Sequence, residues 1–97
     1  MFTIIFNESA LEDLRFLAKT EQTNILAAVE RQLADEPLKA TRNRKPLRPN
    51  DLSRWALRAG VIRVFYDVDE QVQEVTIKAV GRKEHNKLFI RGQEYQL

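Results

Sequence analysis

The stretch Trp55-Ala-Leu-Arg58-Ala-Gly60-Val-Ile-Arg63-Val-Phe-Tyr66 decides the fold of this 97-residue chain. Side chains of different character alternate on both sides of Ala59-Gly60, which is typical of two β-strands joined by a tight turn. In the first strand, Trp55 and Leu57 then form an apolar side. Arg54 and Arg58 form a cationic side. The second strand divides in the same way, with Ile62, Val64, Tyr66 and Val68 on one face and Val61, Arg63 and Phe65 on the other.

Arg63 is the unusual residue of this hairpin, because it stands between β-branched residues in the middle of a strand. A charge in such a place must face water, a partner or a ligand, since burying it unpaired is costly. The hairpin therefore predicts a cationic site for a polyanion, and RNA is the polyanion that we expect. The alternative is an ion pair on the sheet surface with Asp67 or Glu74.

Basic side chains gather in one block around the first strand of the hairpin. Residues 39–63 carry a net charge of +7, with Asp51 as the only acid, whereas the whole chain carries +2. Such asymmetry creates a directional field that suits an anionic partner, unless the charges simply pair within a solvated loop. The residues that we expect to hold a nucleic-acid backbone are Arg42, Arg44, Lys45, Arg48, Arg54 and Arg58.

Several classes of protein are excluded by composition. The chain has no cysteine and one histidine, His85, so disulfides, thiolate metal sites and multi-histidine metal sites are not expected, and no cofactor is indicated. No apolar run approaches the roughly 20 residues that span a bilayer. The first residues lack the basic segment of a signal peptide. We therefore expect one domain, residues 1–97, in a soluble cytoplasmic protein without a membrane partner.

The rest of the chain predicts a small α+β fold. Residues 2–6 are typical of a strand, and apolar residues recur at helical spacing over residues 9–18 and 20–35. A capping box at Ser9 and Glu12, or Asn7 alone, would begin the first helix, and Thr20 would begin the second. Pro37 ends the second helix, and residues 36–53 form a long irregular loop.

After the hairpin, residues 72–80 predict a third strand with Val75, Ile77 and Ala79 on the core face. Residues 88–90 could form a short strand or one helical turn, and residues 93–97 a tail. The expected order is β-α-α-β-β-β, with a helical hairpin packed on a small, mostly antiparallel sheet.

The pattern Trp-x-Leu-Arg-x-Gly-x-x-Arg-Val-x-Tyr at residues 55–66, with the basic stretch that ends at Leu88-Phe89, resembles the RelE/ParE toxin superfamily. The expected order of elements and the chain length agree with that family over nearly the whole sequence. The resemblance implies the toxin of a type II toxin–antitoxin pair. Its partners would be a cognate antitoxin, in a hetero-oligomer, and mRNA in the ribosomal A site.

The resemblance also implies roles for single residues. Arg63 matches the strand arginine that RelE-like toxins use at the scissile phosphate. Lys83 matches an arginine that assists the leaving group, with Arg82 as a register-shifted candidate. His85 and Phe89 are similar to the histidine and phenylalanine of the YafQ-like branch, so His85 receives the acid–base role. The sequence departs from RelE at Ala56, where RelE has a lysine proposed as a base, and at Phe89, where it has a tyrosine.

These residues suit RNA cleavage by the ribose 2′-hydroxyl, which needs no metal. An imidazole with a pKa of about 6.5 can move the proton, and arginine and lysine can stabilise the charge of the transition state. Each residue also has a structural alternative: His85 as an exposed polar residue, Phe89 and Trp55 as core residues. Two other functions remain open at this point. One is a ParE-like inhibitor of DNA gyrase, and the other is an inactive member of the family that only binds RNA or antitoxin.

Overall fold

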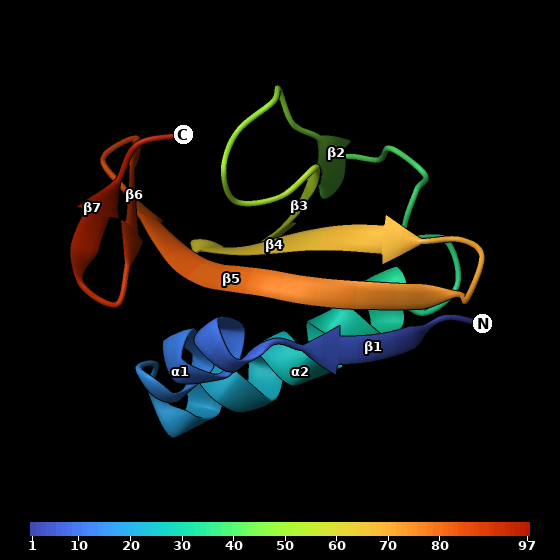
Figure 1. The fold of residues 1–97 in the computed structure, drawn as a ribbon. Coiled ribbons are helices and arrows are strands. Elements are labelled where there is room, and N and C mark those ends of the chain that lie inside the picture. The colour runs from blue at the N-terminus through green and yellow to red at the C-terminus, as the bar shows by residue number, and fades with distance from the viewer.

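The longest strand, β5 (Glu74–Glu84), is the centre of the sheet in this computed structural model, which describes residues 1–97. One edge of β5 pairs antiparallel with β4 (Ile62–Asp69). Its other edge is shared by two strands: β1 (Thr3–Phe6) pairs in parallel with the first part of β5, and β6 (Lys87–Ile90) pairs antiparallel with the last part. Figure 1 shows β5 running the length of the molecule, with β1 beside one half and β6 at the far end.

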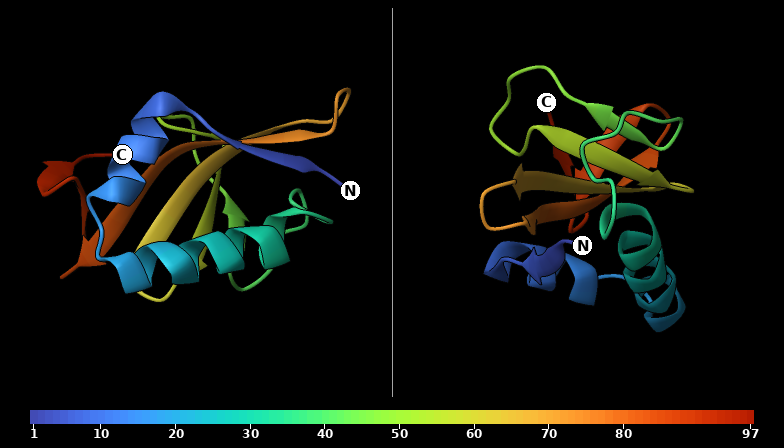
Figure 2. Two further views of the ribbon diagram at one scale, coloured as in Figure 1. Left: turned by 90° about the horizontal axis from the view of Figure 1, so that it is seen from below. Right: turned by 90° about the vertical axis from the view of Figure 1, so that its right-hand side faces the viewer.

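The sheet has seven strands, and its main path runs β2-β3-β4-β5-β6-β7. The outer strands are β2 (Arg44–Pro46) and β3 (Trp55–Ala59) on one side and β7 (Gln93–Tyr95) on the other. Both helices, α1 (Glu8–Arg15) and α2 (Lys19–Leu33), cover the same face of the sheet, as the right-hand view of Figure 2 shows. The predicted α+β class, with a helical hairpin on a mostly antiparallel sheet, is confirmed.

The helix starts differ in part from the prediction. Asn7 caps α1, and its side-chain oxygen accepts a hydrogen bond from the backbone N–H of Ala10 at 2.8 Å. The N-cap of the second helix is Ala18 rather than Thr20, and no side chain caps it. The carboxylate of Glu21 instead accepts from the Ala18 backbone N–H at 3.4 Å.

Two apolar clusters lie on opposite faces of the sheet. The larger one joins the helices to the sheet and includes Leu14, Val29, Leu57 and Tyr66. The smaller one lies on the other face and contains Ala56, Phe65, Ala79 and Leu88. The alternation expected for the central hairpin is therefore present, with Leu57 and Tyr66 under the helices and Phe65 on the opposite face.

A β-bulge in β5 changes the face on which its later residues lie. Phe65 pairs with Ala79 and Tyr66 pairs with Ile77, so Lys78 is an extra residue. The expectation that Ala79 shares the core face of Val75 and Ile77 is therefore wrong: Ala79 belongs to the smaller cluster. From this point on, the alternation of β5 is shifted by one residue.

Three tight turns connect the last strands. The hairpin turn is Gly60–Val61, one residue later than expected, and Gly60 adopts the left-handed backbone (φ +63) that a turn of this kind needs at its first position. His85 and Asn86 (φ 52 and 65) join β5 to β6, and Arg91 and Gly92 join β6 to β7. The expected tail thus contains a strand, and residues 88–90 form a strand rather than a helical turn. None of the helices has the length and apolar character needed to cross a membrane.

Candidate nucleic-acid interface

A cleft of about 220 Å³ opens on the face of the sheet that the helices leave uncovered. Ala56, Phe65 and Leu88 of the smaller cluster lie at its base. Five cationic side chains surround them: Arg42, Lys45, Arg58, Arg63 and Lys83. No acidic side chain lines the cleft.

Strand pairing explains why these cations meet. Arg58 on β3 lies directly opposite Arg63 on β4, and both point away from the helices because their neighbours Leu57 and Val64 point toward them. Lys45 on β2 pairs with Ala56, which lies two residues before Arg58 on β3 and so on the same face of the sheet. Lys83 reaches the same face from β5 because the bulge has shifted the alternation of that strand.

None of the five cations forms an ion pair with a carboxylate. The predicted alternative, in which Arg63 pairs with Asp67 or Glu74, does not occur, and Asp67 lies 3.9 Å from Lys78 instead. The Arg63 Nη1 atom donates to the carbonyl oxygens of Gly60 (2.8 Å) and Ile62 (3.2 Å). The guanidinium has five N–H donors, so donors remain for a ligand.

The surroundings of Arg63 disfavour its charge. Partial burial of the guanidinium, followed by the positive charge of Arg58, lowers the pKa of Arg63 below its ordinary value. Like charges placed directly opposite each other on neighbouring strands are also destabilising. A bound anion would offset the repulsion between these two guanidinium groups.

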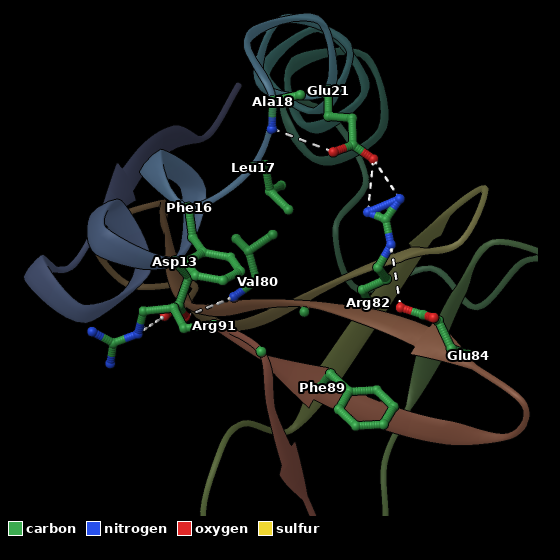
Figure 3. A pocket seen from close by; sticks show the side chains of 12 residues that line it. Asp13, Phe16, Leu17, Ala18, Glu21, Val80, Arg82, Glu84, Phe89 and Arg91 are labelled. Carbon is green, nitrogen blue, oxygen red and sulfur yellow. Dashed lines mark hydrogen bonds and ion pairs between the residues drawn. The ribbon is translucent and has the colours of Figure 1, made fainter.

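Arg82 and Phe89 do not reach the cleft. Both lie on the helix side of the sheet, where they line a second hollow of about 360 Å³. Figure 3 shows Arg82 pointing toward the start of α2, where its Nη1 and Nη2 atoms donate to Glu21 Oε2 at 2.9 and 2.8 Å. The suggested exchange of Lys83 for Arg82 at the cleft is thus not supported by the placement of the two side chains.

Arg44, which the sequence suggested as a nucleic-acid-binding residue, does not line the cleft. Its side chain is buried, and it donates from Nε to the carbonyl oxygen of Lys39 at 3.1 Å and from Nη1 to that of Gln32. These bonds tie the long loop to the end of α2. Arg44 therefore has a structural role in the fold.

The remaining predicted residues do not line the cleft. Arg48 and Arg54 are exposed, and Arg48 shares with Lys45 a shallow hollow on the loop. His85 is exposed at the tip of the β5–β6 turn, two residues beyond Lys83. Sequence reasoning missed Asn43, Leu47 and Leu97, which also line the cleft. They carry no sequence signal of such a role, because loop and tail positions are set by the tertiary fold.

No group of three or more histidine, aspartate or glutamate side chains is placed to hold a metal ion. The cleft therefore combines a cluster of unpaired cations with a partly apolar base, a combination that suits a phosphodiester chain and one or more of its bases.

Comparison with solved structures finds proteins with a similar fold. The chain is similar to a protein in the RelBE2 toxin–antitoxin complex from Mycobacterium tuberculosis, with 28% identity and a TM-score of 0.69 over 84% of this chain and 98% of that one. It is also similar to the isolated RelE toxin of E. coli (21% identity, TM-score 0.69, 88% of this chain and 87% of that one). A third match is the archaeal RelE–RelB complex from Pyrococcus horikoshii OT3 (21%, 0.66, 81% and 91%). No protein-family model matches the chain, and neither does any curated protein.

Proposed function

We propose that this chain, which has 28% identity and a TM-score of 0.69 to a protein of the RelBE2 toxin–antitoxin complex, is a RelE-superfamily toxin of a toxin–antitoxin pair and that it cleaves mRNA in the ribosomal A site. One observation supports the RNA part of the proposal: five cations without carboxylate partners surround a cleft of about 220 Å³. An antitoxin partner is supported by the solved relatives, which include complexes of RelE with RelB.

The phosphate would lie between Arg58 and Arg63. These guanidinium groups stay charged and can each donate two parallel hydrogen bonds to phosphate oxygens. In the reaction, the 2′-hydroxyl attacks its own phosphate, and the bond to the 5′-oxygen of the next nucleotide breaks. The products are a 2′,3′-cyclic phosphate and a free 5′-hydroxyl. Arg63 would stabilise the charge on the phosphorane oxygens, and Lys83 the charge on the leaving oxygen.

His85 is the residue that we propose for proton transfer. It is the only histidine, and the chain has no cysteine, so no other side chain has an ordinary pKa close to neutrality. It is exposed at the tip of the turn, two residues beyond Lys83, which lines the cleft. Cleavage would therefore require bound RNA to extend past Lys83 to the turn.

A second candidate function is RNA binding without cleavage. The observation that favours it is the lining of the cleft, which contains Ala56 and no histidine, aspartate or glutamate. In this case the cleft would hold RNA or an acidic segment of the antitoxin, and His85 would be an ordinary turn residue.

Expression of the chain in bacteria, followed by mapping of mRNA ends, separates these functions. Cleavage predicts growth arrest and new mRNA ends, which His85→Asn and Arg63→Ala should each reduce by about 10²-fold. Asparagine is the suitable replacement for His85, because it tolerates the left-handed backbone of the turn. Arg31→Ala, an exposed and unpaired arginine on α2, is the matched control.

Growth arrest with intact mRNA would contradict the nuclease proposal. Growth arrest with DNA damage would instead point to gyrase. RNA binding by the purified protein, with no new mRNA ends in cells, would select the binding function.

A further inference from the structure

The end of β5 extends beyond its neighbour in the sheet. The last residue pair between β4 and β5 is Ile62 with Arg82. Lys83 keeps one backbone hydrogen bond, from its N–H to the carbonyl oxygen of Val61 at 2.8 Å. Beyond this point, β5 pairs only with β6, which is itself near the edge of the sheet. Sheet pairing alone therefore holds Lys83 weakly on one side.

Carboxylates from both helices bind the end of β5 on the helix side of the sheet, opposite the cleft. Asp13 of α1 accepts a hydrogen bond from the Val80 N–H at 3.1 Å, where the edge of β5 lies open between β1 and β6. Its other oxygen lies 2.9 Å from Arg91 Nε in the β6–β7 turn. Glu21 of α2 binds Arg82 through two nitrogens, and Arg82 Nε lies 3.7 Å from Glu84. Figure 3 shows these contacts converging on the end of β5.

We propose that Glu21 is a positioning residue for the cleft and that it acts through Arg82 on Lys83. Successive residues of a strand point to opposite faces, so a fixed Arg82 on the helix side directs Lys83 into the cleft. Two hydrogen bonds from one planar guanidinium to a single carboxylate oxygen restrict where the Arg82 side chain can lie. This inference rests on the proposed function, because it assigns Lys83 to the stabilisation of the leaving oxygen.

The proposal explains why two neighbouring basic residues have different roles. Arg82 forms ion pairs with Glu21 and Glu84 on the helix side. Lys83 has no carboxylate partner and lines the cleft. A direct role of Arg82 in RNA cleavage would require the Glu21–Arg82 pair to break and the strand to turn over.

The test compares Glu21→Gln, Arg82→Glu and the double variant Glu21→Arg/Arg82→Glu, which reverses the ion pair. Glu30→Gln is the matched control, because Glu30 is an exposed carboxylate on the same helix without an ion pair. Cleavage of ribosome-bound mRNA by each purified protein gives kcat and KM, and thermal unfolding gives stability. We expect Glu21→Gln to lower kcat about tenfold with KM within twofold of the unaltered protein. The double variant should recover most of the lost kcat, and Glu30→Gln should resemble the unaltered protein.

A second measurement does not depend on cleavage. Peptide mass spectrometry measures the rate at which Lys83 Nζ reacts with an amine-modifying reagent. This rate should change in Glu21→Gln and return toward the original value in the double variant. Lys78, which belongs to the same strand, is the internal reference.

The inference fails if Lys83 reacts identically in all variants, or if the double variant remains as impaired as Arg82→Glu, which would indicate a direct role of Arg82. Absence of cleavage of ribosome-bound mRNA by the unaltered protein would contradict the proposed nuclease. In that case the change in Lys83 reactivity would still decide whether Glu21 positions this residue.

Discussion

Replacing Arg63 with alanine should weaken RNA binding while leaving the protein as stable as before or slightly more stable. The substitution removes one of five unpaired cations in the cleft. It also removes a like charge directly opposite Arg58, and relief of such a pair contributes about 0.2–1 kcal/mol to stability. The lost hydrogen bonds to Gly60 and Ile62 are partly exposed and offset some of this gain. A residue that weakens the fold but is required for binding is typical of a functional site.

The size of the binding effect follows from counterion release. Each phosphate contact with a single strand contributes about −0.7 to the slope of log affinity against log salt. If all five cleft cations meet phosphates, the slope is about −3.5, and affinity falls about 10²-fold between about 50 and 200 mM salt. Without Arg63 the slope should be about −2.8, which is a change that a salt titration can measure.

The assay is fluorescence anisotropy with a short labelled RNA that carries 2′-O-methyl groups, because such an RNA cannot be cleaved by 2′-hydroxyl attack. Arg31→Ala, which makes the same change in net charge away from the cleft, should keep the original slope. Equal slopes for Arg63→Ala and the unaltered protein would refute the placement of RNA in the cleft. A marked loss of thermal stability in Arg63→Ala would refute the argument from repulsion.

Three further predictions concern the fold. Gly81→Ala should lower the free energy of unfolding by about 1–3 kcal/mol in chemical denaturation, because the added Cβ would lie 2.8 Å from Leu88 Cδ1 in a packed region; an unchanged midpoint would contradict this close approach. Tyr66→Phe should cost about 1–3 kcal/mol in the same experiment, since the buried hydroxyl donates to the carbonyl oxygen of Pro37 at 2.7 Å and that oxygen would lose its partner. Burial raises the pKa of Asp13 above its ordinary 3.8, against the opposing effects of the Val80 N–H and Arg91, so the native state binds this proton more tightly than the unfolded state does. The contribution of Asp13 to stability should therefore be fully present below about pH 3.8 and decline as the pH rises through the native pKa; Asp13→Asn should lack this decline, and parallel pH profiles would contradict it.

The central hairpin could be predicted from sequence because its signals are local. Alternation from Trp55 to Tyr66 and a glycine at the turn determine which residues share a face, and they bring Arg58 and Arg63 to the same side. The stretch shares its motif with the RelE superfamily, and the comparisons confirm the fold. Lys83 was placed from the resemblance alone, and the structure brings it to the same cleft.

The parts that sequence reasoning missed depend on contacts between distant segments. The bulge at Lys78 shifts the alternation of β5, and no local pattern marks it, so Ala79 was placed on the wrong face and Arg82 seemed exchangeable with Lys83. Arg44 looked like one more basic loop residue, but the end of α2 supplies carbonyl oxygens that bind it. The three-residue strands β2 and β7 form only because longer strands lie beside them.

The facing pair of Arg58 and Arg63 has a consequence for control of the protein. Carboxylates neutralise guanidinium groups as phosphates do, so an acidic peptide that enters the cleft gains the same relief of repulsion as an RNA. The two ligands would then exclude each other at a single place, without any change of shape in the sheet. Inhibition would require only a partner whose acidic side chains bind Arg58 and Arg63 more tightly than mRNA does.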